Sequence, residues 1–145
     1  MRAYSEAYLN DVVENQGKLF DLVSQKYPQK DTFDFINAYM SSKTRKSIDE
    51  AKAYVNTMSA TELWDYFCKT DGFKLKNGKA LEGFMPDWIG EFYAYYQWYY
   101  NIPSSEVIKK IPVDINFDIL QVFLWIFTEV LFHASQEEHE SYLSG

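Results

Sequence analysis

Apolar residues recur along the chain at the three- and four-residue steps of amphipathic helices rather than at the alternate positions of strands. The first stripe predicts a helix over residues 4 to 26 and consists of Tyr4, Tyr8, Val12, Leu19, Phe20, Val23 and Tyr27. Pro28 ends it, and Asp31 or Thr32 can cap a shorter helix, since a short polar side chain satisfies free N–H groups at a helix start. That second helix shares one apolar face among Phe33, Ile36, Tyr39 and Met40.

Two Ser-x-x-Glu sequences fit the capping box, in which a hydroxyl and a carboxylate satisfy N–H groups reciprocally. They are Ser47 with Glu50, and Ser59 with Glu62, the second preceding a clear apolar face. The polar run 41 to 46 predicts a connection between helices, and residues 69 to 79 predict an exposed loop.

The second half of the chain carries further helix signals. Pro86 suits the first turn of a helix that runs to about Tyr100, because its missing N–H needs no partner there. Ser104 can cap a short helix that Pro112 ends, and Asp114 can open a last helix through about His133. We therefore expect an all-α fold, a compact single-domain bundle of six or seven helices over residues 1 to 135, followed by a mobile tail, 136 to 145.

The predicted helix 87 to 100 is unusually aromatic. At 100° per residue, one face holds Trp88, Phe92, Tyr95 and Tyr99, and the next holds Ile89, Tyr93, Tyr96 and Tyr100. The opposite side, Gly90, Ala94, Gln97 and Asn101, is a small or polar groove that another helix could approach closely. The many aromatic rings favour a helix that is buried in the core. The alternative is that this helix forms the wall of a ligand pocket. The polar groups of that pocket would be Asp87, Glu91, Tyr95 and Gln97, with Trp98 beside the two acids.

Composition and charge narrow the class of protein. A chain of 145 residues is the size of one domain, and 19% of its residues are aromatic. The lone Cys68 and the lack of a secretory N-terminal segment predict a cytosolic protein. A net charge of −7 and the absence of any basic residue between 80 and 105 argue against nucleic acid as a partner.

Three smaller features have competing interpretations. Lys43, Arg45 and Lys46 form a basic patch that is either a solvated helix connection or a docking point for an acidic partner or a nucleotide. Cys68 follows an apolar helix face and is interpreted as a core residue rather than a nucleophile. The tail residues His133 to Glu140 are interpreted as a solvated terminus rather than a metal site, so neither a metal nor another cofactor is expected.

The stretch 115 to 132 is mostly apolar but is interrupted by Asn116, Asp118, Gln121, Thr128 and Glu129. We expect a buried core helix, with a self-association or partner surface as the alternative. Membrane insertion is disfavoured, because Asp118 and Glu129 would each cost a few kcal/mol at the centre of a bilayer.

The segment from Glu82 to Tyr100, with Ala-Tyr-Tyr-Gln-Trp at 94 to 98, and the following Ile111-Pro112 resemble a family of small bacterial proteins of unknown function. Three other segments are similar to the same family: Arg2-Ala3-Tyr4 and Tyr8-Leu9-Asn10-Asp11 near the N-terminus, and residues 58 to 63. Members are often encoded beside an ADP-ribosyltransferase-like toxin domain, so the resemblance implies a toxin–antitoxin or accessory role. After Asp114 the chain departs from the family, either because this member diverged or because its reading frame was altered.

These observations favour a non-enzymatic protein-binding or regulatory module, with a co-encoded toxin as the expected partner, because aromatic surface and acidic charge suit protein recognition. The alternative is a small-ligand-binding protein or an enzyme that uses the aromatic helix as a pocket wall. The Ser, His and Asp residues form no recognisable catalytic motif.

Overall fold

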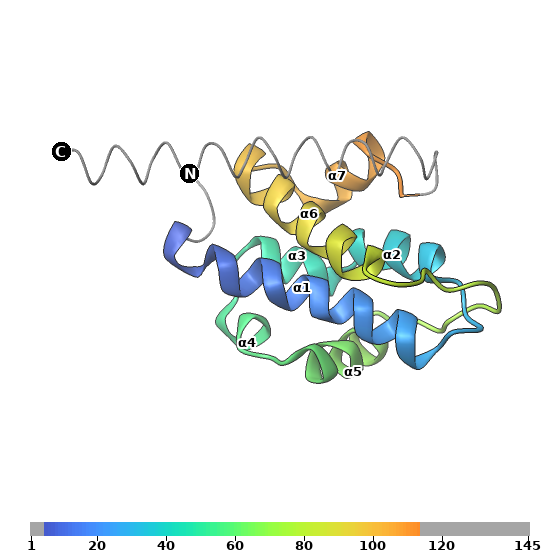
Figure 1. The fold of residues 1–145 in the computed structure, drawn as a ribbon. Helices are drawn as coiled ribbons and strands as arrows, with labels where there is room; N and C mark the ends of the chain where they lie inside the picture. The colour runs from blue at the N-terminus through green and yellow to red at the C-terminus, as the bar shows by residue number, and fades with distance from the viewer. Residues whose placement is uncertain (1–4, 114–145) are drawn as a thin grey trace. The chain divides into compact units, whose positions relative to one another are not determined.

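A computed structural model describes residues 5–113, which form seven α-helices and no β-strand (Figure 1). The helices are α1 (Glu6–Lys26), α2 (Thr32–Met40), α3 (Lys43–Asp49), α4 (Ala53–Asn56), α5 (Ala60–Thr70), α6 (Met85–Tyr100) and α7 (Ser104–Lys110). The chain divides into two units, Met1–Asp114 and Ile115–Gly145, and the described residues all belong to the first. The all-α prediction is confirmed. The predicted helix after Asp114, the apolar stretch 115 to 132, the domain end at 135 and the tail lie outside the described residues.

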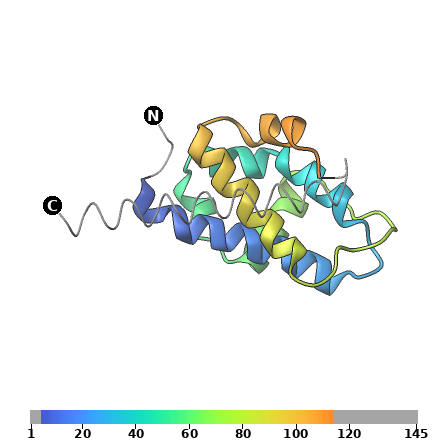
Figure 2. The same cartoon turned by 45° about the horizontal axis from the view of Figure 1, so that its top comes forward.

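The longest helices, α1 and α6, run in opposite directions and cross over one another (Figure 2). Glycines sit at the crossing: a Cβ on Gly90 would lie 2.6 Å from the backbone oxygen of Gln16 and 2.8 Å from Cα of Gly17. Real Cβ atoms do not approach backbone so closely, so only glycine allows this helix spacing. The groove predicted on the Gly90 side of α6 is therefore filled by α1.

The main aromatic core lies between α1, α2 and α5 rather than on α6. Phe35 of α2 is at its centre, with ring centroids 5.6 Å from Phe20, 5.4 Å from Trp64 and 5.9 Å from Phe67. All three of these pairs are edge-to-face, an arrangement that aromatic quadrupoles favour.

Several predicted helix starts are confirmed and two are wrong. Asp31 caps α2 by accepting from the N–H of Asp34 at 3.0 Å, and Ser59 with Glu62 forms the predicted capping box of α5. Ser47 starts no helix: α3 begins four residues earlier, capped by Ser42, and the Ser47 hydroxyl donates to the Lys43 carbonyl. Ser104 is the first residue of α7, whose cap position is Pro103.

The segment between α5 and α6 is held by hydrogen bonds to the α1–α2 connection and to the start of α2. Lys30 and Asn77 form an isolated antiparallel bridge, and the N–H of Leu81 donates to the hydroxyl of Thr32, the first residue of α2, at 3.2 Å. In the described part of the chain, none of the helices has both the length and the hydropathy that crossing a membrane requires.

Candidate functional site

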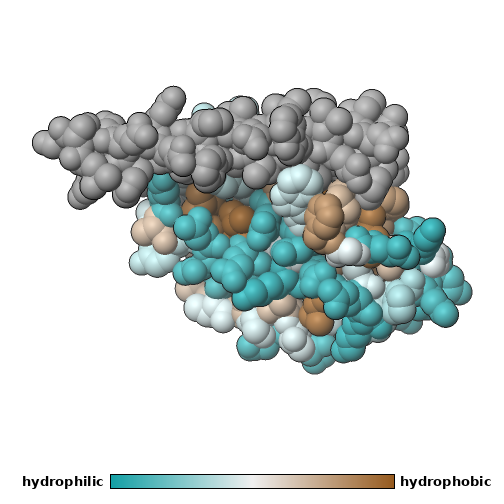
Figure 3. Space-filling model, in the orientation of Figure 1, coloured by the Kyte–Doolittle hydropathy of each residue, from teal (hydrophilic) through white to brown (hydrophobic). Residues whose placement is uncertain are grey.

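Four carboxylates gather where α1 and α6 cross, and we call Glu14, Asp21, Asp87 and Glu91 the acidic face. They meet because Gly17 has no side chain: a Cβ there would collide with the Asp87 carboxylate and lie 2.7 Å from Cγ of Glu91. One cation, Lys18, lies among them and forms an ion pair with Glu14 at 3.1 Å. Figure 3 shows hydrophilic residues along α1 across the middle of the molecular face turned to the viewer.

The two α6 carboxylates are half-buried, and their pKa values are raised. For Asp87, burial raises the pKa most, followed by repulsion from Asp21 and Glu14, while Lys18 lowers it. For Glu91, burial again comes first, followed by repulsion from Asp87 and Glu14. The acidic face therefore holds negative charge at some cost to the folded state.

The aromatic side of α6 is buried in part. Phe92, Tyr93 and Trp98 are buried, while Tyr99 and Tyr100 at the helix end are 46% and 52% exposed. Tyr95 is half-buried, and its ring centroid lies 6.0 Å from Trp98 and 6.3 Å from Tyr99. The core interpretation thus holds for Phe92 and Tyr93 and is wrong for Tyr99 and Tyr100, while Trp98, which was predicted beside the two acids, is buried as well.

Gln97, predicted as a polar group of a pocket, is buried on the small-residue side of α6 at 5% exposure. Its Oε1 has no hydrogen-bond partner among the described residues. A buried acceptor without a partner costs roughly 1–3 kcal/mol.

The basic patch predicted at 43 to 46 is divided between surface and core. Lys43 and Lys46 are exposed, but Arg45 is 1% exposed and points into the bundle, which corrects the prediction of a fully solvated connection. The reason is the helix α3 itself, whose periodicity turns Thr44, Arg45 and Ile48 inward.

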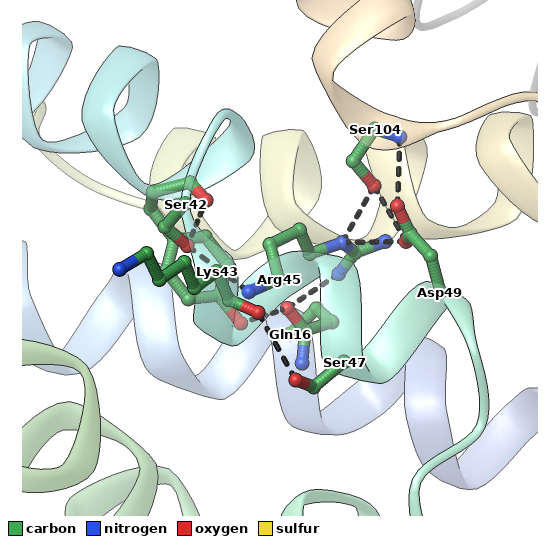
Figure 4. A network of polar contacts seen from close by, with 8 residues as sticks. Gln16, Ser42, Lys43, Arg45, Ser47, Asp49 and Ser104 are labelled. Carbon is green, nitrogen blue, oxygen red and sulfur yellow. Dashed lines mark hydrogen bonds and ion pairs between the residues drawn. The ribbon is translucent and has the colours of Figure 1, made fainter. Parts of the chain in front are cut away.

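Arg45 is the centre of a buried polar network that joins four helices (Figure 4). Its Nη1 donates to Oε1 of Gln16 at 2.5 Å, and its Nε donates to the Ser104 hydroxyl at 2.7 Å. Asp49 supplies the compensating charge, with Oδ1 3.2 Å from Nε, and it also accepts from the hydroxyl and the N–H of Ser104 at 2.7 and 2.8 Å.

Tyr39 completes this network from α2. Its hydroxyl donates to Oε1 of Gln16 at 2.6 Å, and burial raises its pKa to about 12 although Arg45 and Gln16 oppose that shift. The sequence did not predict that Gln16, Asp49 and Ser104 are the partners of Arg45. One sign of a buried polar contact was present, because Gln16 is a polar residue within the apolar stripe of α1.

The carboxylate of Asp71, the residue after α5, lies at the N-terminal end of α3. Its carboxylate accepts from the N–H of Lys43 at 2.8 Å and from the N–H and hydroxyl of Thr44 at 3.3 and 2.6 Å. The N–H groups that the sequence suggested for an external anion are therefore already used.

Cys68 is half-buried, and burial together with the charge of Asp65 raises the pKa of its thiol. A raised pKa keeps the sulfur protonated, which does not favour a nucleophile. Because Cys68 is half-buried rather than buried, the prediction of a core residue holds only in part. Among the residues that the structure describes, no three His, Cys, Asp or Glu side chains are grouped as a metal site would require.

Three of the hollows on the described surface can be placed between named elements. The first, of about 200 Å³, lies between α1, α3 and α4; another, of about 500 Å³, lies between α1 and the start of α5; a third, of about 400 Å³, lies between the end of α1 and residues 80 to 86. None of these three is lined by the aromatic residues of 88 to 100 that were predicted as a pocket wall.

No protein-family model, curated protein sequence or solved structure matches this chain.

Proposed function

We propose that this protein is a non-enzymatic protein-binding module, and that its acidic face binds a basic segment of a partner protein. The observation that carries the proposal is the gathering of four carboxylates at the α1–α6 crossing, where the side chains of Asp87 and Glu91 lie against Gly17. Burial and the neighbouring carboxylates raise the pKa values of Asp87 and Glu91, and like charges held close together are a frequent feature of functional sites.

A basic partner would relieve that repulsion when it binds. Lys or Arg side chains placed opposite the acidic face would offset the charge that Lys18 compensates only in part, and complementary charge speeds association and favours specific partners. The exposed rings of Tyr99 and Tyr100 on the same helix could add apolar contact at the edge of the interface.

The resemblance to small bacterial proteins encoded beside toxin domains makes a co-encoded toxin in the cytosol the first partner to test. In that role the module would be an antitoxin-like or accessory protein.

The test is affinity capture of the co-encoded proteins by wild-type protein and by the double variant Asp87→Asn/Glu91→Gln. A matched control, Asp65→Asn/Glu106→Gln, removes the same charge from exposed positions on α5 and α7. We expect the partner to bind wild type and control, and to bind the acidic-face variant at least about tenfold more weakly, a loss of about 1.4 kcal/mol. Equal capture by all three proteins would contradict the proposal, as would capture of no co-encoded protein.

A further inference from the structure

The hollow between α1, α3 and α4 has the features of a binding site for a small polar molecule. It measures about 200 Å³, and Val12, Ile48 and Val55 give it an apolar interior. The exposed side chains of Asp11, Glu14 and Lys18 form its rim. The hollow is smaller than the roughly 300–1,000 Å³ of sites for drug-sized ligands, so its occupant is small.

One polar side chain of the lining, Gln16, is 1% exposed and has a donor left over. Its orientation is defined, because the arginine Nη1 that contacts it can only donate, and the atom that accepts must be Oε1. Tyr39 donates to the same oxygen. Among the described residues none accepts from Nε2, and Figure 4 shows this nitrogen on the side of Gln16 turned away from the guanidinium.

From this geometry we propose that the hollow binds a small neutral or cationic molecule whose carbonyl oxygen accepts a hydrogen bond from Nε2 of Gln16. The Arg45 network fixes the Gln16 amide in place, so its donor is preorganised and binding costs no side-chain ordering there. The rim carries the two carboxylates of Asp11 and Glu14 and the one ammonium of Lys18, which pairs with Glu14, so its net charge is negative. This charge favours an ammonium group at the other end of the ligand and disfavours an anionic group.

The test uses β-alaninamide, which carries a primary amide and an ammonium group, added to uniformly ¹⁵N-labelled protein and followed by NMR. We expect saturable shifts of the Gln16 side-chain NH₂ resonances. Propionamide, which lacks the ammonium, should shift the same resonances with weaker affinity. Propylamine, which lacks the carbonyl, should leave them unchanged.

Gln16→Glu is the sharpest variant, because it keeps an acceptor for Arg45 and Tyr39 but removes the amide donor that the proposal assigns to the ligand. We expect β-alaninamide to bind it at least about tenfold more weakly. Asn56→Trp, at a half-buried lining position on α4, should block the hollow without touching the buried network, so it tests the site even if Gln16→Glu folds poorly.

Absence of a saturable shift at Gln16 in the wild-type protein would overturn the proposal, and so would equal affinity in wild type and Asn56→Trp. The result is separable from the test of the acidic face, because Asp87→Asn/Glu91→Gln changes no residue of this hollow and should keep β-alaninamide binding.

Discussion

Arg45 shows how one residue connects sequence-distant parts of this protein. Its guanidinium is buried, and its partners come from α1, α3 and α7, so the network holds helices that are up to 59 positions apart in sequence. An arginine in such a site is stabilising only while every partner stays in place, because the burial of its charge is costly.

We predict that Arg45→Met destabilises the protein by about 3–5 kcal/mol, since it leaves the carboxylate of Asp49, whose side chain is only 11% exposed, without its counterion. Urea denaturation measures the change. Lys46→Met, at the exposed neighbouring position, is the control and should change stability by less than about 0.5 kcal/mol. Equal stabilities of the two variants would show that the network contributes nothing specific.

Gln97, in contrast to Arg45, is predicted to destabilise the fold, because its buried side-chain oxygen lacks a hydrogen-bond partner among the described residues. We predict that Gln97→Met, which has a similar volume, raises the free energy of unfolding by about 1 kcal/mol. A thermal or chemical denaturation curve gives the sign directly. A loss of stability would mean that the Gln97 oxygen is satisfied and that the side chain contributes to the fold.

At the scale of helices, the contact of α1 with α6 depends on Gly17 and Gly90. Alanine in the middle of an unhindered helix is about 1 kcal/mol more favourable than glycine. Here the added methyl group would press on the backbone of the other helix, which cannot move aside as a flexible side chain would.

We therefore predict that Gly90→Ala destabilises the protein by about 1–3 kcal/mol, the usual cost of overpacking. The sign of the change in the free energy of unfolding, measured by chemical denaturation, shows whether overpacking or the higher helix propensity of alanine dominates. An increase in stability would mean that the helices separate without cost and that close approach is not required.

The sequence predicted most helices because their signals are local. The apolar stripe of α1, the Ser59 and Glu62 capping box of α5 and Pro86 in the first turn of α6 each act within a few residues. The helix α4 was missed because four residues are too few to show a period. Ser47 was wrongly chosen as a cap because Ser42, five residues earlier, meets the same requirement and is joined there by Asp71 from a distant part of the chain.

The candidate site was predictable only in its residue types. Asp87 and Glu91 could be named from the sequence, and the small residues around Gly90 predicted a close helix contact, but no local pattern shows that α1 makes this contact and brings Glu14 and Asp21 to it. The same holds for Arg45. Its position in a run of basic residues predicted an exposed side chain, but Arg45 lies on the buried face of α3.

At the scale of the whole molecule, charge and stability oppose each other. The chain carries a net charge of −7, and the acidic face concentrates part of that charge between its two longest helices. Such a surface favours a basic partner but weakens the isolated fold.

This conflict has a defined pH dependence. The pKa values of Asp87 and Glu91 are raised in the folded protein, so the folded state binds protons more readily than the unfolded chain. Their contribution to stability therefore increases as the pH falls through the raised values toward the ordinary carboxyl values of about 4, and it is lost again as the pH rises.

The most direct measurement is the free energy of unfolding of the wild-type protein and of Asp87→Asn/Glu91→Gln at pH 7 and at pH 5. We predict that the variant is more stable at pH 7, by about 0.5–1 kcal/mol for these partly exposed groups, and that its advantage shrinks at pH 5. Asp65→Asn/Glu106→Gln should show no such gain. A double variant that is equally or less stable than wild type at pH 7 would contradict the claim that the acidic face is held at a cost to the fold.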